Sequence, residues 1–181
     1  MSPPRNEPRL FRVVVTGSEC TGKTTLAQAL ARRFTAPWVP EFSRRYAEER
    51  RGQLDVSDVE PIARGHLSAE DATALGAGSL LVLDTDLVST VVYAGHYYGD
   101  CPGWIAAAAV ERRGDLYLLA QPDVPWIADG IRDRPDHRFE IHQRFVVELE
   151  RLGAEVVAVA GGWAEREAVA VAAVESLLAG C

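Results

Sequence analysis

Five short apolar runs recur along the chain. They lie at Val13–Val15, Trp38–Val39, Leu80–Leu83, Leu116–Leu119 and Val156–Val159. Most of these runs are continuously apolar and do not alternate with polar residues, a pattern typical of strands that are covered on both faces. The pattern therefore predicts five strands, most of them covered on both faces.

Helical periodicity separates these runs. A first helix is predicted from Leu26 to Phe34, directly after the first strand. Further helices are predicted at about Ser57–Leu75, Asp86–Tyr98, Trp104–Arg113, Arg138–Leu152 and Trp163–Leu178. Ser57 and Glu60 have the spacing of a capping box at the start of the second helix. Alternation of strand and helix predicts an α/β fold, a three-layer sandwich around a five-stranded parallel sheet.

The segment Gln121–His137 is irregular. It follows the fourth strand and contains three prolines, one glycine and two arginines. Long loops without regular structure often form lids that close over a substrate, so we expect a lid at about residues 121–138. Residues 1–10 are polar and contain proline, which predicts a flexible tail. The length of 181 residues suits one domain, predicted at residues 11–181.

A glycine-rich motif lies between the first strand and the first helix. It fits the phosphate-binding pattern G-x-x-x-x-G-K-[S/T] and consists of Gly17, Ser18, Glu19, Cys20, Thr21, Gly22, Lys23, Thr24 and Thr25. The glycines let the backbone bend so that N–H groups point at phosphate oxygens, and the helix N-terminus adds a favourable dipole. Lys23 is expected against the β- and γ-phosphates and the Thr24 hydroxyl on Mg²⁺. The motif predicts binding of a nucleoside triphosphate with magnesium.

The composition limits which kinds of molecule the chain is expected to bind. The net charge is −7 and the sequence has no basic stripe, which argues against nucleic-acid binding. No apolar run approaches the roughly 18 residues of a membrane span. The three cysteines include no C-x-x-C pair, so neither a zinc site nor a disulfide framework is expected and the cytoplasm is the predicted location. The sequence leaves open whether the chain forms a homo-oligomer.

Three acidic residues follow predicted strands, where ligands of parallel sheets gather. Asp84 ends the third strand and is expected to bind magnesium directly or through water, or else to be a simple strand-end acid. Asp86 follows two residues later beside the same strand end and is also a candidate helix N-cap, and the two roles can coexist. Glu41 follows the second strand and is placed to accept or orient the proton of an acceptor hydroxyl. Its alternative role is pairing with Arg44 or Arg45.

Arginines and aromatic residues complete the candidate set. Arg132, Arg134 and Arg138 lie in or after the irregular loop, where a guanidinium that arrives on closure stabilises transferring phosphate charge. The alternative is exposed arginines paired with Asp133 and Asp136. Aromatic side chains that could stack on a planar ring, or could instead pack in the core, are Tyr46, Tyr93, Tyr97, Tyr98, Trp104 and Trp126.

Four segments together resemble one family. They are the glycine-rich motif with its strand, VPEFSRRYAEE, LLVLDTDLVST and PWIADGIRDRPDHR. In order and spacing they resemble the ribosylnicotinamide kinase domain of the bacterial NAD-biosynthesis regulator NadR, one of the P-loop kinases. The glycine-rich motif is common to all P-loop proteins, whereas D-T-D and P-W-x-A-D-G-x-R are much more specific. The likeness runs from about Phe11 to the C-terminus.

The resemblance implies a P-loop kinase fold with a lid, and a reaction. The γ-phosphate of ATP is transferred, with Mg²⁺, to the 5′-hydroxyl of nicotinamide riboside, giving nicotinamide mononucleotide. The chain has neither an H-x-G-H signature nor a DNA-binding region before the kinase part, so it is expected not to complete NAD or bind an operator. The alternatives are a kinase for another nucleoside or vitamin alcohol and a nucleotide-binding regulatory ATPase.

The resemblance also implies roles for individual residues. The catalytic candidates are Lys23, Glu41, Asp86 and Arg132. Arg134 and Arg138 join the glycine-rich motif in binding ATP. Thr24 and Asp84 are the expected metal ligands. The candidates for binding the nucleoside acceptor are Glu41, Phe42, Arg45, Tyr46, Asp86, Trp126 and Asp129.

Overall fold

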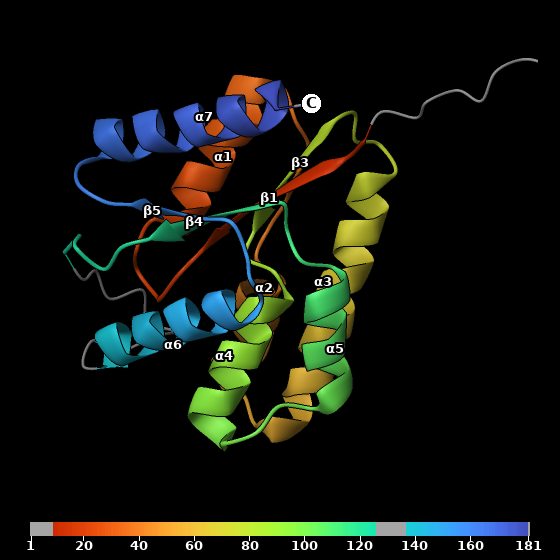
Figure 1. The fold of residues 1–181 in the computed structure, drawn as a ribbon. Helices are drawn as coiled ribbons and strands as arrows, with labels where there is room; N and C mark the ends of the chain where they lie inside the picture. The colour runs from red at the N-terminus through yellow and green to blue at the C-terminus, as the bar shows by residue number, and fades with distance from the viewer. Residues whose placement is uncertain (1–8, 126–136, 181) are drawn as a thin grey trace, which may run out of the picture.

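Five parallel strands form a single sheet at the centre of the molecule (Figure 1). The structure is a computed structural model that describes residues 9–125 and 137–180. Each strand lies where the apolar pattern predicted it: β1 Phe11–Thr16, β2 Trp38–Val39, β3 Leu80–Asp84, β4 Leu116–Ala120 and β5 Val156–Val159. The order across the sheet is β2-β3-β1-β4-β5, and every neighbouring pair is parallel.

Helices cover both faces of this sheet, so the predicted three-layer α/β fold is confirmed. Their bounds are α1 Lys23–Phe34, α2 Phe42–Glu49, η1 Val56–Asp58, α3 Val59–Ala74, α4 Leu87–Tyr98, α5 Gly103–Glu111, α6 Arg138–Arg151 and α7 Trp163–Ala179. In Figure 1, α1 and α7 lie on one face, and α3, α4, α5 and α6 lie on the other. None of the described helices is both long and apolar enough to span a bilayer.

The two covered faces explain the continuous apolar runs. Along β1, Val13 and Val15 pack in the core beneath α1 and α7, whereas Val14 between them packs in the core on the opposite face. Successive strand residues point to opposite faces, so a strand covered twice must be apolar at every position. The hydrophobic pattern therefore follows directly from the layer arrangement.

The start of the helix expected at Ser57 is different from the prediction. The capping box is formed by Asp55 and Asp58, not by Ser57 and Glu60. The Asp55 carboxylate accepts from the Ser57 amide at 2.8 Å, and Asp58 accepts from the Asp55 amide at 2.9 Å. An ionised carboxylate is a stronger acceptor than a hydroxyl. The cap therefore forms at Asp55, two residues before Ser57, and it begins the short helix η1, which leads into α3.

Helix α2 was not among the predicted helices. It is short and polar, and only Ala47 of its residues is buried. The Phe42 ring packs directly on the backbone of Gly65 in α3, where any larger side chain would collide with the ring. Helix α2 is therefore stabilised by a tertiary contact and not by a strong apolar pattern of its own.

Candidate active site

The phosphate loop between β1 and α1 has a backbone that only glycine accommodates at two positions. Gly17 has a φ of 132°, and a Cβ there would lie 2.7 Å from the carbonyl oxygen of Ala120. Gly22 has a φ of 81°, and a Cβ there would collide with the indole of Trp163. These two glycines let the loop turn tightly beneath the N-terminus of α1, the geometry that directs amide N–H groups at an anion.

Lys23 lies across this loop. Its side chain is buried, and Nζ donates to the carbonyl oxygen of Ser18 at 2.8 Å. The Thr21 hydroxyl donates to the same oxygen at 2.8 Å. The ammonium group is thus held over the concave side of the loop, where it can neutralise phosphate charge.

The two predicted metal ligands are brought together. Thr24 Oγ1 donates to Asp84 Oδ2 at 2.6 Å, although 60 positions separate them in sequence. Both are hard oxygen donors, which suit Mg²⁺. Within residues 9–125 and 137–180 no group of three or more His, Cys, Asp and Glu side chains is suited to a metal. Mg²⁺ commonly binds through one or two protein oxygens together with waters and substrate phosphates, which the oxygens of Thr24 and Asp84 suit.

A cavity of about 410 Å³ opens beside the phosphate loop, between α2, η1, α3 and α4. Its acidic lining residues are Glu19, Asp55, Asp58 and Asp86. Three tyrosines also line it: Tyr93, Tyr97 and Tyr98. Among the described residues that form the wall there is neither lysine nor arginine. The cavity is therefore aromatic and rich in acids, one of which, Asp58, is paired with Arg50 at 3.1 Å.

Asp86 forms part of this wall and also caps α4. Its Oδ1 accepts from the Val88 amide at 3.0 Å, as the N-cap alternative predicted, and its Oδ2 accepts from the Tyr117 hydroxyl at 2.6 Å. Burial raises the pKa of Asp86 to about 6, partly offset by the hydrogen bond from Tyr117. Capping and exposure to the cavity coexist in this one side chain.

Glu41 lies at the N-cap position of α2 and is largely buried. The Ser43 hydroxyl donates to Glu41 Oε1 at 2.9 Å. Arg44 pairs with Glu48 along α2, and Arg45 lies 3.9 Å from Glu49. Glu41 is absent from the lining of the cavity, whereas its neighbour Ser43 is part of it. Of the two candidate carboxylates, Asp86 is therefore the one in direct contact with the cavity.

Three further acceptor candidates lie on α2 without lining the cavity. Phe42 packs on α3, and the guanidinium of Arg45 lies 4.9 Å from the centre of the Phe42 ring. The Tyr46 hydroxyl donates to Asp58 Oδ1 at 2.9 Å. Tyr46 therefore orients an acidic wall residue. The remaining candidates Trp126, Asp129, Arg132 and Arg134 lie outside the described residues.

Arg138 begins α6 and is buried next to the phosphate loop. Nε and Nη2 of its guanidinium have no hydrogen-bond partner within the described part of the chain. Burial lowers the pKa of Arg138, and the charges of Cys20 and Asp123 oppose this shift. A buried guanidinium with unsatisfied donors is strongly stabilised by an anion. The position suits the predicted contact with a phosphate oxygen.

Arg166 is a residue that sequence reasoning missed. It is 1% exposed, and its guanidinium donates to the carbonyl oxygens of Gly161 at 2.8 Å, Gln121 at 3.1 Å and Thr21 at 3.2 Å. It also pairs with Asp123. These bonds fasten the phosphate loop to the ends of β4 and β5. An arginine in a helical pattern is normally read as solvent-exposed, so the sequence carried no signal for this role.

The tyrosines of α4 connect the cavity to the phosphate loop. Tyr93 and Tyr97 stack with ring centres 6.1 Å apart and planes 13° apart, and the Tyr97 hydroxyl donates to Glu19 at 3.2 Å. His66 of α3 lines the same cavity, and burial lowers its pKa, which favours the neutral imidazole. Tyr93 and Tyr97 were among the aromatic candidates. The structure shows that both tyrosines line the cavity, whereas their spacing in the sequence did not distinguish this position from core packing.

Comparison with known proteins places the chain among P-loop proteins. A family model described as an AAA domain matches residues 12–166. The chain is 33% identical over 153 residues to the trifunctional NAD biosynthesis/regulator protein NadR of Escherichia coli strain K12, covering 81% of this chain and 37% of that protein. The NadR of Salmonella typhimurium strain LT2 is 34% identical over 124 residues, with coverages of 66% and 30%. The chain thus spans well under half the length of these curated relatives.

Solved structures show the same fold. NadR in complex with NR is 26% identical, with a TM-score of 0.78 over 92% of this chain and 49% of that chain. NadR in complex with NAD and AMP-PNP is 28% identical, with a TM-score of 0.77 and the same coverages. Thymidylate kinase from Ehrlichia chaffeensis, at 14% identity and a TM-score of 0.66, covers 94% of this chain and 100% of that chain, and shares the fold alone.

Proposed function

This chain belongs to the AAA domain family and, within it, to the NadR type of P-loop kinase domain. From this membership we propose that the chain phosphorylates nicotinamide riboside. ATP supplies the γ-phosphate, the riboside 5′-hydroxyl accepts it, and the products are nicotinamide mononucleotide and ADP. The NadR structures with NR and with AMP-PNP support a riboside acceptor and an adenine nucleotide donor.

The charge of the cavity is the observation that carries this proposal. Nicotinamide riboside presents a planar pyridinium ring with a positive charge. Four carboxylates and three tyrosines line the cavity, and its described wall contains no cationic Lys or Arg. Carboxylates attract a cation through space, and the faces of tyrosine rings do so through their quadrupole. A neutral or anionic acceptor of the same size gains neither interaction.

The donor half of the site is formed by the phosphate loop. Amide groups of the loop and Lys23 hold the β- and γ-phosphates, and Arg138 supplies a further positive charge. Thr24 and Asp84 are the residues that would hold Mg²⁺. When bound, this ion neutralises charge on the phosphate oxygens. Lys23 and Arg138 therefore act mainly by stabilising charge and fixing the direction of transfer.

The acceptor half is the cavity. The tyrosines enclose the ring, and Asp86 lies where the wall meets the carboxyl end of β3, next to the metal ligand Asp84. A carboxylate at this point accepts a hydrogen bond from the 5′-hydroxyl and orients its oxygen for attack on the γ-phosphate. Glu41 at the end of β2 is the second acid at this edge of the sheet.

A nucleoside panel tests the proposal. The purified chain is incubated with Mg·ATP and nicotinamide riboside, nicotinic acid riboside, uridine, cytidine or thymidine, and both ADP and the phosphorylated nucleoside are quantified. We expect the highest kcat/KM with nicotinamide riboside. Turnover of another nucleoside without product from nicotinamide riboside would sink the proposal, and ATP hydrolysis without any nucleotide product would favour a regulatory ATPase.

Reduced nicotinamide riboside is the matched control for charge. Its dihydropyridine ring has nearly the same size and the same carboxamide, but it is neutral. If the acidic cavity recognises the cation, kcat/KM for the reduced riboside falls about 10-fold, the size expected for loss of a partly desolvated cation contact. Equal kcat/KM values for the two ribosides would show that charge does not select the acceptor.

A further inference from the structure

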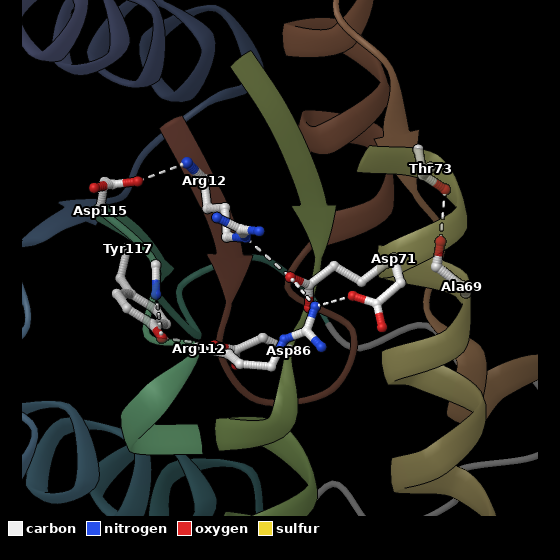
Figure 2. Close-up of polar contacts among 10 residues, drawn as sticks. Arg12, Ala69, Asp71, Thr73, Asp86, Arg112, Asp115 and Tyr117 are labelled. Carbon is white, nitrogen blue, oxygen red and sulfur yellow. Dashed lines mark hydrogen bonds and ion pairs between the residues drawn. The ribbon is translucent and has the colours of Figure 1, made fainter. Parts of the chain in front are cut away.

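Tyr117 is the second residue of β4 and is completely buried in the sheet. Its side chain packs on the face covered by α3 to α6, in the core that includes Leu119 of the same strand. A phenylalanine would fill this position equally well. The hydroxyl reaches past the core to Asp86 at the start of α4 (Figure 2). A buried hydroxyl is unfavourable unless it is hydrogen-bonded, so the role of this group lies in its partners.

The hydrogen bonds of Tyr117 have a fixed direction. The Gly114 amide donates to the Tyr117 oxygen at 3.1 Å. An amide N–H can only donate, so the single proton of the hydroxyl is left for Asp86 Oδ2, 2.6 Å away. This arrangement holds the hydroxyl as a donor to the carboxylate and not as an acceptor.

Asp86 is thereby held at both oxygens. The Val88 amide of its own helix binds Oδ1 at 3.0 Å, and Tyr117 binds Oδ2 from another element. Two donors from two directions define the plane of the carboxylate, which the helix cap alone would leave free to rotate. A carboxylate offers about four lone-pair sites, so with donors from Tyr117, Val88 and Ser89 one site remains for a ligand hydroxyl.

Glu70, an acid whose charge acts on Asp86, is neutralised by two arginines. Glu70 of α3 is buried, and it accepts from Arg12 at 2.9 Å and from Arg112 at 3.0 Å. Arg112 also pairs with Asp71 (Figure 2). These arginines are therefore engaged by other acids, and the Tyr117 hydroxyl donates to Asp86 from a side chain.

We propose that Tyr117 is a positioning residue that holds the Asp86 carboxylate in the orientation that accepts the hydroxyl of the nucleoside. This rests on the proposed function, because it takes the cavity to be the acceptor site. Tyr117 touches no substrate itself, as it lies behind Asp86 and is absent from the cavity wall. It acts through the direction of a single carboxylate.

Tyr117→Phe removes the hydroxyl and keeps the ring that fills the core. We expect kcat to fall about 10-fold while the KM for ATP stays unchanged, because one orienting hydrogen bond to the acceptor side is lost. Thr73→Val is the matched control. It removes a hydroxyl that donates to the Ala69 carbonyl at 2.7 Å on α3, away from the cavity, and should leave kcat and both KM values unchanged.

A double-mutant cycle with Asp86→Asn separates positioning from a general packing role. If Tyr117 acts through Asp86, then Tyr117→Phe in the Asp86→Asn background lowers kcat by less than about 2-fold. The same cycle is measured on nucleoside binding by calorimetry in the presence of AMP-PNP, so that coupling is obtained even where turnover is very slow.

Two results would overturn the role of Tyr117. One is additive effects of the two substitutions in both measurements. The other is an equal loss of affinity for ATP and for the nucleoside, which marks a structural defect. A wild-type protein that phosphorylates a different nucleoside overturns the proposed acceptor instead, and the cycle is then run on that nucleoside.

Discussion

Lys23 is the single lysine of the 181-residue sequence, so any side-chain ammonium group that acts on the phosphates is its own. Its ammonium group already lies over the phosphate loop, 2.8 Å from the Ser18 carbonyl. We expect Lys23→Ala to lower kcat by about 10²-fold or more, since the charge acts on the transferring group. Circular dichroism should show an unchanged fold. Turnover within a few-fold of wild type would show that transfer does not occur at this loop.

The two acidic candidates differ in what they touch. Asp86 lines the cavity, whereas Glu41 lies behind Ser43 at the start of α2. We therefore expect Asp86→Asn to lower kcat by about 10²-fold or more, and Glu41→Gln to have the smaller effect. Both variants should keep the KM for ATP near that of wild type. A larger loss of kcat in Glu41→Gln would make Glu41 the proton acceptor.

Arg166 shows how one side chain can fix several elements. From α7 it binds backbone oxygens in the phosphate loop and at the ends of β4 and β5. These oxygens lose their donor if the guanidinium is removed, and Asp123 loses its partner. The positions of three loops that meet at the nucleotide site therefore depend on a helix that ends the described chain.

Arg166→Met is expected to lower the free energy of unfolding by about 3–5 kcal/mol, because it breaks a buried ionic and hydrogen-bonded group. The KM for ATP should rise as the loop loosens. Arg33→Met is the control: Arg33 of α1 and Glu175 of α7 form an exposed ion pair worth about 0–1 kcal/mol. Urea unfolding measures the free energy of unfolding of both variants. Equal decreases in the two variants would show that Arg166 does not hold the three loops together.

At the scale of the whole molecule, the net negative charge and the acidic cavity would both attract a cationic substrate. The net charge is −7, and the acceptor cavity is lined by four of the acids. An acidic protein attracts a cationic substrate over distances of about one Debye length, which salt shortens from about 30 Å at 0.01 M to about 10 Å at 0.1 M.

Salt should therefore raise the KM for nicotinamide riboside. We expect a several-fold increase between about 0.01 M and 0.3 M NaCl at saturating ATP, because exposed charges are screened over this range. The KM for reduced nicotinamide riboside, which carries no charge, should stay constant. Parallel increases for both ribosides would indicate that salt acts on the enzyme and not on recognition of the cation.

Strand positions and the phosphate loop followed from local pattern. A strand covered on both faces must be apolar at each residue, as at Val13 to Val15, and a phosphate loop requires glycine at Gly17 and Gly22 whatever surrounds it. Thr24 and Asp84 were both predicted as magnesium ligands, and the structure brings the two side chains into contact. The strand order and the Asp55 capping box were not.

The acceptor site required the folded chain. Tyr117 is indistinguishable from any other apolar strand residue until β4 lies beside α4, and Arg166 is indistinguishable from a surface arginine until α7 packs on the phosphate loop. The cavity joins residues from the phosphate loop, α2, η1, α3 and α4. The sequence by itself determined the strands of the sheet and the phosphate loop, since both depend on contiguous residues. The tertiary structure decided the walls of the cavity and the bond between Tyr117 and Asp86, since these are contacts between segments far apart along the chain.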